Sequence, residues 1–196
     1  MANAPLNTEL LDRAIKFAVD AHSGTERRGK GFPYVVHVLE ALEIAATMTS
    51  DQEVLAAAVL HDTIEDTDVT AEILRREFGN RVASLVEADT DIVLPDVSEK
   101  SSWRARKQAA IDRLATVGRD AKIVALGDKL SNMRAIRRDF AVLGDSLWSR
   151  FHAPGGAADH EWHYRGLAQS LKELDGTPAY SEFTQAIEQV FEKQKR

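Results

Sequence analysis

The sequence predicts an all-α fold, a single-domain helical bundle. Apolar residues recur with a period of 3.6 along nearly every segment, and valine-rich runs that alternate with a period of two are absent. The chain of 196 residues, 44% of them hydrophobic, is long enough to bury one core. It shows no internal repeat and no linker long enough to divide it. We therefore expect roughly nine or ten helices in one domain over residues 1–196, with 139–196 completing the bundle.

The first two predicted helices are separated by a basic loop. Asn7 or Thr8 caps the first helix, which ends near Gly24. Residues 25–33 contain two glycines, one proline and three positive charges, a composition typical of a loop. Tyr34 begins the second helix.

The third predicted helix is apolar along most of its length. Asp51 is its expected N-cap, and residues 54–60 form an uninterrupted apolar run. Such a run indicates a helix buried on all sides. We expect a polar turn at residues 63–69.

Capping residues and glycines mark the ends of the later helices. Asp68 or Thr70 caps a short helix that Gly79 ends, Gly118 ends a later long helix, and Asp120 caps the next one. The loop at 89–98 is expected to cover the site. The remaining predicted segments are helices at about 80–88, 98–117, 121–138, 159–174 and 178–193, and a loop at 149–159.

Composition excludes several classes of function. A net charge of −6 argues against broad nucleic-acid binding. No run of 18 apolar residues is present, which excludes a transmembrane span, and charged residues interrupt the first 20 positions, unlike a secretory signal. The absence of cysteine fits a cytoplasmic protein and removes thiolate ligands. Any metal must be held by His, Asp or Glu, which favours Mn²⁺, Mg²⁺, Fe or Zn²⁺.

Four ionisable side chains directly follow the apolar third helix. His61 and Asp62 are adjacent, and Glu65 and Asp66 come one helical turn later. At helical spacing His61 shares a face with Glu65, as Asp62 does with Asp66. Such groups are costly to desolvate unless a cation compensates them. We therefore predict a divalent-cation site in which one pair holds the metal and the other positions a water. The alternative is a solvated acidic helix end.

Two further donors complete a recognisable pattern. Twenty-three residues separate His37 from the His61-Asp62 pair, and Asp128 lies on a later helix. This set resembles the HD superfamily of metal-dependent phosphohydrolases. It is more similar still to the hydrolase domain of RelA/SpoT-type alarmone enzymes and to the free-standing small alarmone hydrolases. The likeness covers about residues 7–138, and the motifs that carry it are Arg28, residues 31–34 with His37, residues 61–67 and residues 126–134.

The resemblance implies a role for each motif residue. It implies one divalent cation per chain, Mn²⁺ before other metals, and its implied ligands are His37, His61, Asp62 and Asp128. Glu65 and Asp66 are implied to position the attacking water and handle its proton. The substrate contacts that we expect are Arg28 on phosphate or base, Asn132 on the ribose or nucleotide, Lys30 in a loop able to fold over an anion, and Lys129 and Arg134 on phosphate.

Two departures from the family pattern affect the expected substrate contacts. Gly29 stands where the family often has Lys, and Ala135 stands where it often has a polar residue. Both leave the metal set intact, so they bear on which nucleotide is bound. We also expect no synthetase domain in a chain of this length.

Other polar and aromatic residues have simpler interpretations. His22 is expected to be packed or to cap the first helix. His160 and His163 imitate a second metal site, but we interpret them as the polar face of a helix whose buried side includes Trp162. Trp148 is expected to be a core or interface anchor.

Three functions remain open at this point. The first is metal-dependent hydrolysis of the 3′-pyrophosphate of ppGpp-type alarmones, or of the adenine equivalents. The second is an HD phosphohydrolase for another nucleotide, such as NADPH or a deoxynucleotide. The third is a non-catalytic helical binding protein. In the first two the partner is a small nucleotide, with no nucleic acid and no membrane, and the protein can be a homo-oligomer.

Overall fold

The computed structural model describes residues 7–90 and 99–192, and these residues confirm the all-α class. They form ten α-helices, two short 3₁₀ helices and no strand beyond an isolated bridge between Glu26 and Pro33. The elements are α1 (Glu9–Ala21), α2 (Val35–Ala46), α3 (Gln52–Leu60), α4 (Thr63–Asp66), α5 (Ala71–Phe78), α6 (Asn80–Asp89), α7 (Glu99–Thr116), α8 (Arg119–Leu143), η1 (Gly144–Arg150), α9 (Ala157–Ser170), η2 (Lys172–Leu174) and α10 (Pro178–Phe191).

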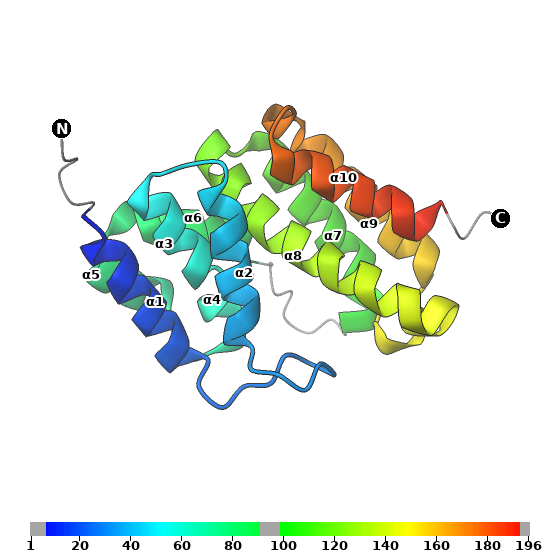
Figure 1. The fold of residues 1–196 in the computed structure, drawn as a ribbon, viewed down its shortest axis with the longest axis horizontal. Helices are drawn as coiled ribbons and strands as arrows, with labels where there is room; N and C mark the ends of the chain where they lie inside the picture. The colour runs from blue at the N-terminus through cyan, green and yellow to red at the C-terminus, as the bar shows by residue number, and fades with distance from the viewer. Residues whose placement is uncertain (1–6, 91–98, 193–196) are drawn as a thin grey trace, which may run out of the picture.

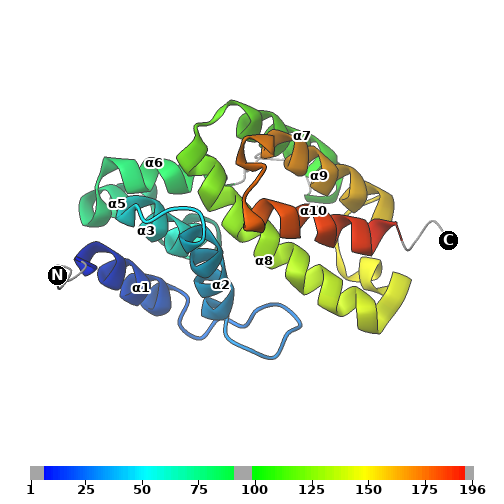
Figure 2. The ribbon, with the colours of Figure 1, turned by 45° about the horizontal axis from the view of Figure 1, so that its top comes forward.

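The long helix α8 runs through the middle of the molecule (Figure 1). It packs against α2, α3 and α6 on one side and against α10 and η1 on the other. The second view shows the same division, with α1, α2, α3, α5 and α6 on one side of α8 and α7, α9 and α10 on the other (Figure 2). Helix α8 thus packs against both halves of the bundle.

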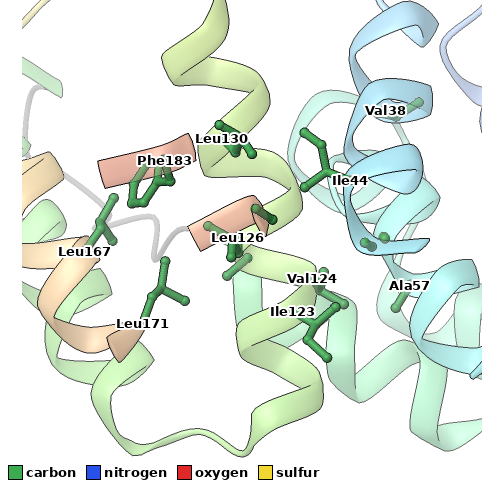
Figure 3. Close-up of a cluster of buried hydrophobic side chains, with 14 of the residues drawn as sticks. Val38, Ile44, Ala57, Ile123, Val124, Leu126, Leu130, Leu167, Leu171 and Phe183 are labelled. Carbon is green, nitrogen blue, oxygen red and sulfur yellow. The ribbon is translucent and has the colours of Figure 1, made fainter. Parts of the chain in front are cut away.

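Apolar side chains fill the space on both sides of α8 (Figure 3). Residues 54–60 of α3 are all buried, as the apolar run predicted. The Asp51 side chain caps this helix by accepting a hydrogen bond from the Glu53 amide at 2.9 Å. The labelled core residues are Val38, Ile44, Ala57, Ile123, Val124, Leu126, Leu130, Leu167, Leu171 and Phe183.

Gly127 allows α2 and α8 to approach closely. A Cβ atom at this position would lie 2.7 Å from the carbonyl oxygen of Ala41, closer than side-chain carbons pack against backbone. His37 lies one turn before Ala41 on α2, and Asp128 follows Gly127 on α8. The contact therefore brings two predicted metal donors to the same place.

Several predicted boundaries were wrong. Residues 63–66 form the one-turn helix α4 and are not a polar turn. Gly118 is the N-cap of α8, whereas Asp120 lies in its first turn and accepts from Arg81 at 2.7 Å. Helix α8 continues to Leu143, because the first residue in a left-handed conformation after it is Gly144, with φ +54°.

Smaller differences occur elsewhere in the chain. Thr70, and not Asp68, caps α5, since its hydroxyl accepts from the Ile73 amide at 3.3 Å. Most of the predicted loop at 89–98 lies outside the described residues, apart from Asp89, which ends α6, and Thr90. In the described part of the chain, no helix is both long and apolar enough to cross a membrane.

Candidate metal centre

Three helices distant in sequence bring the four predicted metal donors together. His37 lies on α2, His61 and Asp62 follow the last residue of α3, and Asp128 lies in the middle of α8. One ligand atom from each residue lies within 4.8 Å of the others. The predicted set is therefore a single cluster in space.

The donor atoms are spaced as ligands of one small cation. His37 Nε2 lies 3.3 Å from Asp62 Oδ2 and 3.1 Å from Asp128 Oδ1. His61 Nε2 lies 3.0 and 3.5 Å from the same two oxygens. Metal–ligand bonds of about 2.1 Å put neighbouring ligands roughly 3.0 Å apart in an octahedron and roughly 3.4 Å apart in a tetrahedron. These distances agree, so the residues present fit a divalent cation.

The histidine rings present their Nε2 atoms to the cluster without hydrogen-bond partners. Both Nε2 atoms are buried and unpartnered. The other ring nitrogens are engaged: His61 Nδ1 lies 2.8 Å from the Ala58 carbonyl oxygen, and His37 Nδ1 lies 2.8 Å from Ser131 Oγ. A carbonyl can only accept, so Nδ1 of a neutral His61 carries the proton and Nε2 carries the lone pair. Histidine ligands of metals are oriented in this way.

The charges of the centre favour bound positive charge. Burial opposes ionisation of Asp62, but His61 and His37 outweigh it and hold the pKa of that carboxyl well below its usual range. Burial also opposes ionisation of Asp128, yet Lys129 and the two rings hold its pKa well below the usual range. Burial disfavours a charged His61, but Asp62 and Asp128 raise its pKa well above the ordinary value. The two ionised carboxylates thus favour positive charge between the side chains. A proton supplies one such charge, and a divalent cation supplies two.

Asp128 is held by two neighbours on its own helix. Its Oδ2 accepts from Lys129 Nζ at 2.5 Å, and its Oδ1 accepts from Asn132 Nδ2 at 2.5 Å. Lys129 also donates to Asp89 Oδ1 at 3.1 Å, and Asn132 Oδ1 accepts from Arg27. Lys129 is therefore engaged with carboxylates, whereas Asn132 links the metal cluster to the basic loop.

Tyr34, for which no functional role was predicted, also contacts the cluster. Its hydroxyl donates to Asp62 Oδ2 at 2.6 Å, and its ring stacks on His22 at 4.9 Å with Arg27 over it at 5.0 Å. Burial and the Asp62 charge raise the pKa of this phenol, so it remains a donor. Its place three residues before His37 on one helix face was the available signal. The expected packing of His22 is confirmed by this stack.

A comparison with known families identifies the fold. The sequence model of the HD domain family matches residues 14–156. The chain belongs to the HD domain family. Its helical fold and its cluster of two histidines and two aspartates are those expected of such a domain, which binds a divalent metal.

This HD domain is similar to named relatives in sequence. It is 32% identical over 188 residues to guanosine-3′,5′-bis(diphosphate) 3′-pyrophosphohydrolase MESH1 of Danio rerio, covering 94% of each chain. It is 36% identical over 138 residues to a guanosine-3′,5′-bis(diphosphate) 3′-pyrophosphohydrolase of Aquifex aeolicus, covering 69% of this chain and 19% of that protein. The chain thus spans about a fifth of the length of such bacterial relatives.

Solved structures agree with this assignment. The structure of a metazoan SpoT ortholog that hydrolyses ppGpp superposes with a TM-score of 0.72 at 25% identity, covering 97% of this chain and 98% of that one. A crystal structure of a Listeria monocytogenes protein gives a TM-score of 0.69 at 28% identity, covering 80% of this chain and 99% of the other.

The two carboxylates predicted to act on water lie beside the donors of this HD domain. Glu65 and Asp66 are on α4, the single turn that begins immediately after Asp62, and both are exposed. The Tyr34 hydroxyl faces Asp66 as well as Asp62. Both carboxylates therefore follow the donor Asp62 within one helical turn of the chain.

A cavity of about 850 Å³ lies next to the metal cluster, with Tyr34 and Asn132 in its wall. Nucleotide-sized ligands occupy cavities of roughly 300–1,000 Å³. Both basic and aromatic side chains line this one, a composition suited to phosphates and a base. The basic residues are Arg27, Arg28, Lys30, Arg106, Lys107 and Arg150, and the aromatic ones include Tyr34, Trp103, Phe151 and Tyr164.

Two predicted phosphate contacts have other partners. Arg134 donates to both carboxylate oxygens of Glu182 at 2.8 and 2.6 Å and to Glu40 at 3.3 Å. Lys129 contacts Asp89 and Asp128, as described above. Lys30 lines the cavity but is paired with Asp139. Arg28 lines the same cavity.

The interpretation of His160 and His163 as a polar helix face was wrong. Both rings are buried, whereas Trp162 is only half-buried. His160 packs against Trp103, Trp148 and Phe151, with ring centroids 4.7–5.5 Å apart. Burial lowers the pKa of His160 to about 4. These residues form an aromatic cluster, and within the described residues they make no second metal group. Trp148 is a buried anchor, as predicted.

Proposed function

We propose that this protein hydrolyses the 3′-diphosphate of guanosine 3′,5′-bis(diphosphate)-type nucleotides, using one divalent cation, Mn²⁺ before others. The products are pyrophosphate and GDP, or GTP from the pentaphosphate. The observation that carries the proposal is the metal-donor cluster at the edge of a nucleotide-sized basic cavity. The similarity to MESH1 over 94% of both chains supports the choice of substrate.

The residues proposed to hold the cation are His37, His61, Asp62 and Asp128. A bound divalent cation lowers the pKa of a coordinated water and neutralises charge on a phosphoryl oxygen. Tyr34 donates a hydrogen bond to Asp62 and Asn132 donates one to Asp128. These bonds keep one oxygen of each aspartate oriented. The ligand set therefore needs little rearrangement before reaction.

Glu65 and Asp66 are proposed to orient the attacking water and to accept its proton. The water oxygen forms a bond to the phosphorus joined to the ribose 3′ oxygen. The bond between that phosphorus and O3′ breaks in line, and the proton returns to O3′ as pyrophosphate leaves. The position of both carboxylates on α4, next to Asp62, supports this assignment.

The proposed substrate contacts come from the basic loop and α8. Arg28 and Lys30 line the cavity and can bind phosphate, Arg28 through paired hydrogen bonds. Asn132 lines the same cavity one turn after Asp128, where it can meet a ribose hydroxyl. Lys129 and Arg134 are paired with carboxylates, so the proposal does not depend on them.

A nucleotide panel tests the proposal. Purified protein is stripped with chelator, restored with Mn²⁺, and incubated with ppGpp, pppGpp, ppApp, pppApp, NADPH and deoxynucleotides. We expect pyrophosphate release from the 3′-diphosphate nucleotides, only after metal is restored. Turnover of NADPH or deoxynucleotides alone, or equal rates with and without metal, would refute the proposal. A cytoplasmic location, a single domain over the whole chain and a homo-oligomeric state stay predictions from the sequence.

A further inference from the structure

The second ring nitrogen of His37 begins a chain of polar groups that leads away from the metal centre. His37 Nδ1 lies 2.8 Å from Ser131 Oγ on α8, and that hydroxyl donates to Glu40 Oε2 on α2 at 2.7 Å. The first two groups are buried and the third is partly exposed: 2% of the His37 side chain and 24% of the Glu40 side chain are exposed, and Ser131 is 2% exposed.

The proton positions along this chain follow from donor counting. A serine hydroxyl has one proton, and a carboxylate only accepts, so the Ser131 proton points to Glu40. Ser131 Oγ must then accept from His37, which places the imidazole proton on Nδ1. The lone pair of a neutral His37 is left on Nε2, the buried atom without a partner that faces Asp62 and Asp128.

Glu40 is in turn fixed from the other side by Arg134. Arg134 Nη1 donates to Glu40 Oε1 at 3.3 Å, while its Nε and Nη2 donate to Glu182 at 2.8 and 2.6 Å. Arg138 lies 4.0 Å from Glu40 Oε2. The guanidinium groups balance the charge of Glu40, and Glu182 connects the network to α10.

The two histidines of the cluster are thus oriented by different means. His61 depends on a backbone carbonyl, that of Ala58, which no side-chain substitution removes. His37 depends on the side chains of Ser131 and Glu40. The orientation of one candidate ligand can therefore be changed by substitution without touching the ligands themselves.

We propose that Ser131 and Glu40 form a positioning relay that fixes the His37 tautomer for metal binding, with Arg134 as its anchor. The relay rests on the proposed metal site. In this relay Arg134 holds Glu40 in place and so supports metal affinity, whereas the sequence had suggested a contact with substrate phosphate. Partners of this kind change metal affinity by about 10- to 100-fold.

The test is calorimetric titration of Mn²⁺ into chelator-stripped wild type, S131A, E40A and the double variant S131A/E40A. Wild type should bind one equivalent, and each single variant should bind about 10- to 100-fold more weakly. Because the two residues act in series, the double variant should bind no more weakly than S131A. Urea unfolding in chelator checks that each variant is folded.

Two matched controls separate the relay from general effects. Glu43→Ala removes a mostly exposed carboxylate from the next turn of α2, 3.8 Å from Arg134, and should leave Mn²⁺ affinity unchanged. Ser170→Ala removes a half-buried serine hydroxyl that donates to the Ile111 carbonyl, between α9 and α7. It should also leave the affinity unchanged.

The outcomes distinguish the relay from the metal site itself. No stoichiometric binding by wild type would refute the metal site of the proposed function. If wild type binds normally, two results would overturn the relay alone. One is an affinity of S131A or E40A within twofold of wild type, and the other is additive losses in the double variant. If S131A does not fold, the comparison of E40A with Glu43→Ala decides the question by the same measure.

Discussion

Gly127→Ala should weaken both the fold and the metal centre, because the added methyl group meets backbone. The new Cβ would lie 2.7 Å from the Ala41 carbonyl oxygen and 3.4 Å from its carbon, so α2 must move away from α8 by several tenths of an ångström. His37 and Asp128 lie on the two separating helices, and their donor atoms are now 3.1 Å apart.

The expected magnitude combines two opposing terms. Forcing an extra methyl group into a packed interior costs typically about 1–3 kcal/mol. Replacing glycine by alanine within a helix contributes roughly 1 kcal/mol of stabilisation. We therefore expect Gly127→Ala to be destabilised by ~1 kcal/mol in urea unfolding with chelator present. Mn²⁺ affinity measured by calorimetry should fall about tenfold, since one donor moves out of bonding distance.

Gly166→Ala is the matched comparison. It also adds a methyl group inside a helix, but its closest neighbour, at 2.5 Å, is Cδ1 of Ile111, the movable end of a side chain. Its Mn²⁺ affinity should equal that of wild type. If Gly127→Ala were as stable as wild type and bound Mn²⁺ as tightly, the helix contact would not set the donor spacing.

Four further predictions concern the site and its surroundings. Asp62→Ala should abolish Mn²⁺ binding in calorimetry, and retained stoichiometric binding would contradict the ligand set. Glu65→Ala should still bind Mn²⁺ but lose most pyrophosphate release, so full activity in that variant would remove its assigned role. Arg28→Ala should raise KM more than it lowers kcat in steady-state assays, because the contact is made in the ground state; the reverse pattern would count against it. The pKa of His160 is about 4 in the folded protein and 6.5 ordinarily. Between pH 6.5 and pH 4 the unfolded chain therefore binds more protons than the folded one, and the protein loses stability as the pH falls. The free energy of unfolding should therefore differ between pH 7 and pH 4, and His160→Phe should reduce that difference by up to ~3 kcal/mol. An unchanged difference in the variant would show that the His160 ring does not cause it.

Local signals in the sequence predicted most of the fold. Asp51 and Thr70 cap helices through side-chain bonds to amides two or three residues away, which depend on the neighbouring sequence alone. The four candidate metal donors, which were picked out because they lie at fixed places in motifs, also lie together in space.

Contacts between helices could not be predicted in the same way. Glu40, Ser131 and Arg134 meet only because α2, α8 and α10 pack together, and no spacing along the chain encodes those pairs. The face of α9 was misassigned for a related reason. This helix packs against both α7 and α10, so His160 and His163 are buried although they are polar.

The central position of α8 separates two properties of the protein. Helices α2 and α3, on one side of α8, lead to His37, His61 and Asp62, whereas the cavity residues Trp103, on α7, and Phe151, just after η1, come from the other side. Divergence in α7 and at the end of η1 can therefore change that part of the cavity wall while the metal ligands are preserved. A chimaera that exchanges only those segments between relatives should change the nucleotide preference and keep the Mn²⁺ affinity.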